Sequence, residues 1–207
     1  RLTRIPSARD YTSIIPWGAN RNELIIGLSN YEDGVASGDA ISLLNWNQDA
    51  VRSVVNARKS SFGSLAAADF DQDGDLDLFV AGRVEPTRYP IAVDSYFFEN
   101  DRGTLRLAHT FSKLGMVTGV VFSDLDGDGS PELIVAREWN TLKVFSGDLG
   151  QPKDITQQWQ LDQLSGWWNG ITSGDFNGDG RMDLVATNWG HNHKYELSTT
   201  HPLKLYY

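Results

Sequence analysis

The sequence contains one acidic pattern of nine residues three times, and this repeat constrains the fold more than any other feature. The copies begin at Asp69, Asp124 and Asp175, which are 55 and 51 residues apart. A pattern that recurs at a period of a few tens of residues is typical of chains built from stacked structural repeats. We therefore expect a repeat architecture with one acidic loop in each of three units.

The residues around the three loops are also similar. They form short runs that are rich in β-branched and aromatic residues and are separated by Gly, Asn, Asp and Pro, which predicts strands joined by turns. No segment has a sustained helical period. Units of about 50 residues with three or four strands are the size of β-propeller blades, so the sequence predicts an all-β fold built of such blades. The expected strands lie at 65–68, 120–123 and 171–174 before the loops, at 78–81, 133–136 and 184–187 after them, and at 95–98, 142–145 and 203–206 beyond.

A fourth, degenerate copy precedes the other three. Its expected strands are 23–27 and 41–44, and an offset of 54 residues aligns its loop with the first acidic loop. Residues without carboxylates then stand at the loop positions, so we expect no ion there. These residues are Ile15, Trp17, Ala19 and Asn20.

The repeat divides the chain into four expected units of one propeller. Residues 1–60 form a degenerate blade without a calcium loop, 61–115 and 116–166 form blades with one loop each, and 167–207 form an incomplete blade with the third loop.

Each acidic loop places oxygen donors at positions 1, 3, 5 and 9 and a glycine at position 6, where the chain has to turn. Calcium prefers six to eight oxygen ligands, and the backbone carbonyl of position 7 supplies one more whatever its side chain. We therefore expect three Ca²⁺ sites. In order of position, the expected ligands are Asp69, Asp71, Asp73, Asp75 and Asp77; Asp124, Asp126, Asp128, Ser130 and Glu132; and Asp175, Asn177, Asp179, Arg181 and Asp183.

An EF-hand, a magnesium site and a plain hairpin turn each fit the loops less well than this calcium site. An EF-hand requires a bidentate Glu at position 12 and flanking helices, whereas position 12 here is Val80, Val135 or Ala186. Magnesium favours small octahedral sites that keep several waters. Hairpin turns also favour Asp and Gly, but a turn does not require five carboxylates within nine residues, which repel one another without a cation.

The charge of the chain is concentrated in these loops. The net charge is −9, and the loops hold 12 of the 27 acidic residues, so the remaining 15 are outnumbered by 18 Lys and Arg. The acidity is therefore a local property, and the net charge argues against a nucleic-acid partner. The chain has no cysteine and no apolar run that approaches the roughly 18 residues of a membrane span, so we expect neither disulfides nor membrane insertion.

The loop sequences resemble a known family. DFDQDGDLDL at 69–78, DLDGDG at 124–129 and GDFNGDG at 174–180 are similar to FG-GAP/VCBS repeats, the calcium-loop blades of integrin α-subunit propellers and of many bacterial surface proteins. The resemblance covers residues 13–207. It implies a propeller, commonly seven-bladed, in an extracellular, cell-surface or periplasmic protein that serves for binding, adhesion or as a scaffold. Four units are too few for seven blades, so we expect part of a larger ring, with a closed four-bladed ring as the alternative.

The sequence leaves the role of such a module open among three classes. The first is a binding or adhesion module whose blade loops meet a protein or a glycan, and the partner can also be the rest of the ring or another copy of the chain. The second is a propeller domain of a polysaccharide lyase or hydrolase, although no nucleophile elbow, zinc signature or phosphate loop is present, so we expect no enzyme. The third is a structural segment of a surface assembly.

Several side chains outside the loops are candidates for a partner surface. Tryptophans near strand ends offer faces for sugars, although packing between blades is the simpler interpretation. Histidines or arginines after the inner strands could meet a metal or an anionic partner, although ordinary surface positions explain them as well. These candidates are Trp139, Trp167, Trp168 and Trp189; His191 and His193; and Arg83, Arg88 and Arg137.

Overall fold

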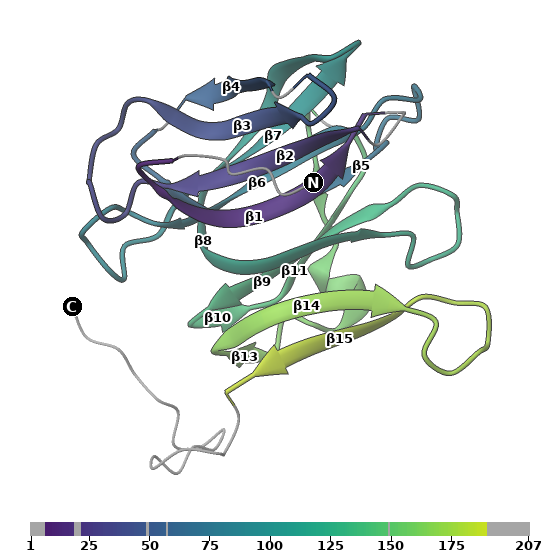
Figure 1. Ribbon diagram of the computed structural model, residues 1–207. Coiled ribbons are helices and arrows are strands. Elements are labelled where there is room, and N and C mark those ends of the chain that lie inside the picture. Colours follow the sequence, from purple (N-terminus) through teal and green to yellow (C-terminus); the bar gives the residue numbers. More distant parts are fainter. Residues whose placement is uncertain (1–6, 19–21, 49, 57, 149, 190–207) are drawn as a thin grey trace.

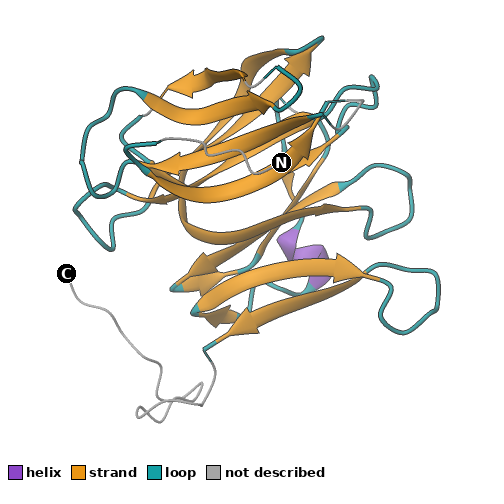
Figure 2. Ribbon diagram, viewed as in Figure 1, coloured by secondary structure: helices purple, strands orange, loops and turns teal. Residues whose placement is uncertain are grey.

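Antiparallel β-strands make up most of the fold, as the sequence predicts. The computed structural model describes residues 7–18, 22–48, 50–56, 58–148 and 150–189 (Figure 1). In this part of the chain the strands form separate sheets stacked on one another, and the helical content is one 3₁₀ turn, η1 (Thr156–Trp159) (Figure 2). The all-β class and the blade-like units are therefore confirmed.

The first unit is a four-stranded meander. Its strands pair in chain order: β1 (Asp10–Trp17), β2 (Glu23–Ser29), β3 (Asp39–Asn45) and β4 (Ala50–Asn56).

The expected place of the degenerate loop in this meander is wrong. Ile15 and Trp17 lie in β1, where Trp17 pairs with Glu23 and is 5% exposed. The chain between β1 and β2 is shorter than an acidic loop, so the offset of 54 residues does not hold across the turn. Ala19 and Asn20 lie outside the described residues.

The second sheet has seven strands because one long strand belongs to two units. β8 (Thr104–Ser123) is 20 residues long. Its first part pairs with β7 as far as Gly115, and its second part pairs with β9 from Met116 onward. The other strands of this sheet are β5 (Ser61–Ala68), β6 (Asp77–Val84), β7 (Val93–Asp101), β9 (Glu132–Glu138), β11 (Lys143–Ser146) and β12 (Lys153–Asp154).

Two smaller sheets complete the described structure. β10 (Asn140–Thr141) pairs with β13 (Ser165–Gly166), and β14 (Trp168–Gly174) pairs with β15 (Asp183–Asn188). The strand expected at 203–206 lies outside the described residues.

The strands that follow the first two acidic loops, β6 and β9, are buried on both faces. On β6, Leu78 and Val80 join the core against the meander, whereas Phe79 and Ala81 join the core against β8 and β9. All four are 0% exposed. Successive side chains of a strand point to opposite faces, so an uninterrupted apolar run fills two cores at once.

The first strand of each unit lies beside the first strand of the next: β1 beside β5, β5 beside β8, and β8 beside β14. Hydroxyl groups link them. The Oγ of Ser13 accepts from the Leu65 N–H (3.4 Å), the Oγ of Ser64 donates to the Thr118 carbonyl (2.9 Å), and the Oγ1 of Thr118 donates to the Trp168 carbonyl (2.8 Å). The units are therefore joined through side chains along the row of first strands.

Candidate metal centres

Each acidic loop connects the first and second strands of its unit. The closing pairs are Ala68 with Asp77, Ser123 with Glu132, and Gly174 with Asp183. The loops after β8 and β14 project on the same side of the stack, at the right of Figures 1 and 2. The strand pairing thus places position 9 of every loop at the first residue of a buried or half-buried strand.

Four backbone hydrogen bonds recur in all three loops. The carboxylate of position 1 accepts from the N–H of position 6, the side chain of position 3 from position 5, that of position 5 from position 7, and that of position 9 from position 2. In the first loop the acceptors are Asp69 (3.1 Å), Asp71 (3.2 Å), Asp73 (2.9 Å) and Asp77 (3.1 Å). The second and third loops repeat the set with distances between 2.7 and 3.1 Å.

Positive backbone φ angles allow this shared turn. Position 6 is a glycine with a φ of 97°, 92° or 84° at Gly74, Gly129 and Gly180. Position 4 is also left-handed, and there the first loop has Gln72 (φ 63°) where the others have glycine. The sequence pattern therefore encodes a single backbone conformation three times.

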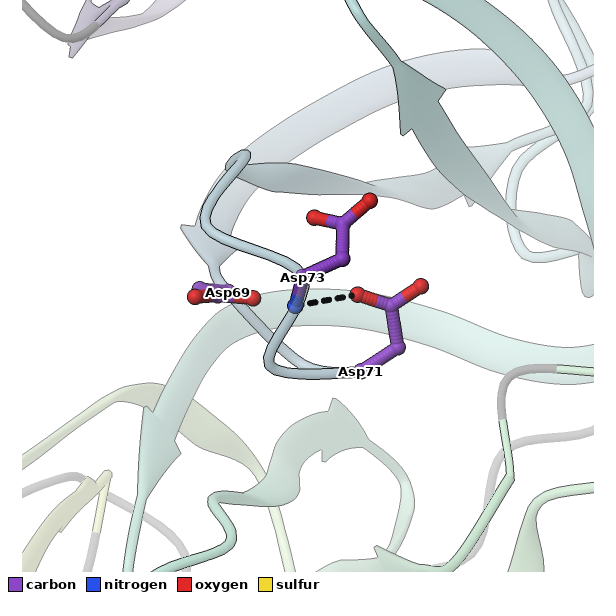
Figure 3. Close-up of side chains that lie close together, drawn as sticks. All are labelled: Asp69, Asp71 and Asp73. Carbon is purple, nitrogen blue, oxygen red and sulfur yellow. Dashed lines mark hydrogen bonds between the residues drawn. The ribbon is translucent and has the colours of Figure 1, made fainter.

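The shared turn gathers carboxylates in the first two loops. Asp69, Asp71 and Asp73 bring one oxygen each to within 4.8 Å of one another, and Asp124, Asp126 and Asp128 do the same. Figure 3 shows the first cluster, with the Asp73 N–H donating to Asp71. The Oδ1 of Asp69 is buried and lacks a hydrogen-bond partner among the described residues. A buried, unpartnered carboxylate oxygen beside two more carboxylates fits a hard divalent cation, so these two clusters could hold a metal ion.

The position-9 acids are the most buried members of the loops. Asp77 is 1% exposed and accepts from the N–H groups of Phe70 and Asn100, and its burial raises its pKa from 3.8 to about 6. Glu132 is 3% exposed, and burial, helped by the charges of Asp126 and Asp128, also raises its pKa. An ionised carboxylate at these positions is costly without a compensating positive charge.

The third loop differs in charge and exposure. Position 3 is Asn177, whose Nδ2 donates to Asp179, so positions 1, 3 and 5 carry two carboxylates instead of three. Asp175 is exposed and accepts backbone N–H groups from Gly180, Gly178 and Asp179, which lower its pKa. The geometry is that of the other loops, whereas the concentration of negative charge is smaller.

At position 7, the side chains of Asp75 and Ser130 have partners outside their own loops. Asp75 accepts from the Arg102 N–H (3.0 Å), and Ser130 interacts with Gln72 of the preceding loop (3.2 Å). Arg181, the third residue at position 7, is exposed. The backbone carbonyl of this position is the ligand expected in all three loops.

Three of the four candidate tryptophans come together. Trp139, Trp167 and Trp189 form a row with ring centroids 4.6 and 4.1 Å apart. Trp168 is not part of this row, and its Nε1 donates to the Leu164 carbonyl (3.1 Å). The row lies at strand ends, as the sequence predicts, and connects the unit that contains β9 with the next unit, which contains β14 and β15.

The surface interpretation of the candidate arginines is wrong for one of them. Arg137 is 6% exposed, its guanidinium donates to the carbonyls of Leu114 and Thr141, and burial lowers its pKa to about 10. Arg88 is exposed, and Arg83 is half-buried and paired with Glu138. His191 and His193 lie outside the described residues.

This arrangement defines a class of protein, a repeat of antiparallel blades with an acidic turn between the first two strands of the unit. The model of the FG-GAP-like repeat matches residues 69–135 and 124–186, which is more than half of the chain. The chain therefore belongs to the FG-GAP-like repeat family. Within the described residues no helix is of a length and apolarity that would let it cross a membrane.

The chain is also similar to the T-cell immunomodulatory protein of two rodents. It is 33% identical to that of Mus musculus over 87 residues, 42% of this chain and 14% of the relative, and 34% identical to that of Rattus norvegicus over 77 residues, 37% and 13% of the two chains. The match thus spans about one seventh of the length of these curated relatives.

Proposed function

We propose that this chain is an extracellular binding or adhesion module whose blades are stabilised by Ca²⁺ in the three acidic loops. The observation that carries the proposal is the set of four hydrogen bonds repeated in each loop, which directs oxygens at positions 1, 3 and 5 toward one another. FG-GAP repeats are typical of extracellular and cell-surface proteins, and even weak calcium sites fill where calcium is millimolar. The chain has no disulfide, so bound ions would provide the cross-link that secreted domains usually obtain from cystine.

The acids at position 9 connect calcium to blade stability. Asp77 joins the loop to two blade strands, because it begins β6 and accepts from Asn100 in β7. A cation at the loop would compensate the cost of burying this charge and would hold the first three strands of the unit in register. The expected role of the ions is therefore structural.

We propose that an open apolar surface on β15 and the acidic loop before it packs against another blade, either of the same ring or of another copy. Phe176, Met182 and Val185 are 59%, 48% and 46% exposed. At the position equivalent to Phe176, Phe70 is 8% exposed because the next unit covers it. This difference supports a larger ring with the blade division at 1–60, 61–115, 116–166 and 167–207.

Thermal unfolding with calcium and with excess chelator tests the proposal. An ion present at a hundred times its Kd stabilises a folded protein by about 2.7 kcal/mol, which raises the melting temperature of a chain of this size by roughly 5–10 °C per site. Magnesium at the same concentration serves as the control and should give a smaller shift. A melting temperature that does not respond to chelator would refute calcium stabilisation.

A further inference from the structure

A pocket of about 500 Å³ lies at the ends of the strands opposite the acidic loops. Its walls come from the start of β1, the chain after β2, the start of β5 and the end of β6, and two residues of β8, Val117 and Thr118, also line it. The first acidic loop joins the other ends of β5 and β6, since β5 runs from Ser61 to this loop at Ala68. The pocket is therefore separate from the candidate metal centres.

The pocket contains charged groups of both signs with unused hydrogen-bonding capacity. The Nη2 of Arg83 pairs with the Oε1 of Glu138 at 2.5 Å, whereas its Nη1 is buried and lacks a partner among the described residues. Asp10 and Glu32 also line the pocket and are exposed, and their side chains make no hydrogen bond or ion pair within the described part of the chain. The side chain of Arg83 as a whole is 31% exposed, so the accessible edge of its guanidinium can donate to a ligand in the pocket.

These groups restrict the charge of that ligand. A cation would pair with Asp10 and Glu32 but would be repelled by the guanidinium of Arg83. An anion would satisfy Arg83 but would be repelled by the two carboxylates. A neutral molecule with several hydroxyl groups can donate to the carboxylates and accept from the guanidinium, because each hydroxyl does both.

A row of aromatic rings extends from the pocket across the neighbouring units. Tyr89 lines the pocket, and its hydroxyl accepts from the Nε1 of Trp139 (2.9 Å) and lies 3.2 Å from the Oε2 of Glu138. Trp139 contacts Trp167, which contacts Trp189. The two ends of the row, Tyr89 and Trp189, are 44% and 49% exposed.

Hydroxyl-binding groups in a pocket and an exposed aromatic row beside it match the two kinds of surface on a sugar chain. Sugar hydroxyls form hydrogen bonds, and the C–H faces of the rings pack on aromatic side chains. An aromatic row that continues outside the pocket fits a ligand longer than one sugar unit. Small-molecule sites generally combine such apolar walls with a few convergent polar groups.

We propose that this pocket and the aromatic row from Tyr89 to Trp189 bind a neutral oligosaccharide, with one sugar in the pocket and further sugars along the tryptophans. The proposal deepens the proposed function, since it assigns a ligand class to the binding module.

Binding of a panel of neutral tetrasaccharides to the calcium-loaded chain tests the inference, with intrinsic tryptophan fluorescence and isothermal titration as readouts. The panel contains glucose, mannose, galactose and N-acetylglucosamine tetramers, and matched uronic-acid tetramers form the anionic arm. The variants are D10N, which removes a carboxylate charge from the pocket, and W189A, which removes the exposed end of the row. We expect each to weaken binding of the preferred neutral tetramer at least about tenfold.

Two matched variants act as controls. W46A removes a tryptophan that is 42% exposed in the turn after β3, at the opposite end of the strands, and E99Q neutralises a half-buried acid of β7 outside the pocket. Both should bind the preferred tetramer like the parent chain. Calcium-dependent melting of every variant separates loss of binding from loss of folding.

Three results would overturn the inference: no binding to any neutral tetramer by a chain that melts as a calcium-loaded protein, tighter binding of the uronic-acid tetramer than of its neutral match, or full binding by both D10N and W189A. None of them bears on calcium stabilisation, which the melting experiment tests separately.

Discussion

The ring of Phe70, at position 2 of the first acidic loop, packs against Phe122 of β8 with ring centroids 5.7 Å apart. The two residues belong to consecutive units, so the loop that gathers carboxylates on one side also supplies an apolar contact to the next unit on the other. Leu125, at position 2 of the second loop, is equivalent to Phe70. It belongs to a buried cluster against which Ile171 of β14, in the following unit, packs.

This relationship predicts unequal effects of one substitution at equivalent positions. Phe70→Ala should destabilise the chain by about 3–5 kcal/mol, because it removes a buried aromatic ring. Phe176→Ala, at the exposed equivalent, should cost less than about 1 kcal/mol. Chemical denaturation in calcium measures both, and equal losses would show that the two loops do not differ in packing.

A second prediction concerns the loop acids. Asp124→Asn keeps an oxygen at position 1 but removes one charge from the cluster, so it should lower the calcium-dependent gain in stability by about 1–3 kcal/mol. Stability in chelator should change less than stability in calcium. Asp101→Asn, at the β7–β8 turn, is the control. A calcium response of the D124N variant equal to that of the parent would contradict the site.

A third prediction is an unusual pH dependence without calcium. The folded pKa of Asp77 is about 6, above its ordinary 3.8, and that of Glu132 is also raised. The folded state therefore binds more protons than the unfolded state between pH 4 and 6, and its stability should fall as pH rises through this window. The two-unit shift at Asp77 alone corresponds to about 2–3 kcal/mol.

Calcium should remove this trend, because a cation favours the ionised acids. Denaturation midpoints at pH 5 and 7, with calcium and with chelator, provide the measurement. A chelated protein that is more stable at pH 7 than at pH 5 would contradict this effect of the buried acids.

A fourth prediction uses two glycines on neighbouring first strands. A Cβ on Gly119 would lie 2.9 Å from the Cα of Gly170 and 2.9 Å from the Ile171 nitrogen, whereas a Cβ on Gly170 would meet only the Thr187 hydroxyl at 3.7 Å. Gly119→Ala should therefore separate β8 from β14 and cost more than about 2 kcal/mol. Gly170→Ala should be nearly neutral, and thermal melts of the two variants compare them directly.

The sequence predicts the regular parts of this structure because they repeat. Runs such as 78–81 and 133–136 are apolar at every position, and only a strand between two cores buries them all. The repeat spacing misplaces the turn after Trp17 because this turn is shorter than an acidic loop, and no residue pattern marks the change in length. The pocket has no signature in the sequence, since Asp10, Arg83 and Tyr89 come from separate strands and loops and meet only through the packing of the units.

The 20-residue strand β8 also has a mechanical consequence. Its residues up to Gly115 form the last strand of one blade, and those from Met116 onward form the first strand of the next, without a loop between them. Tension on either blade thus passes to its neighbour along a covalent, hydrogen-bonded strand. The two blades are expected to yield as one element under force.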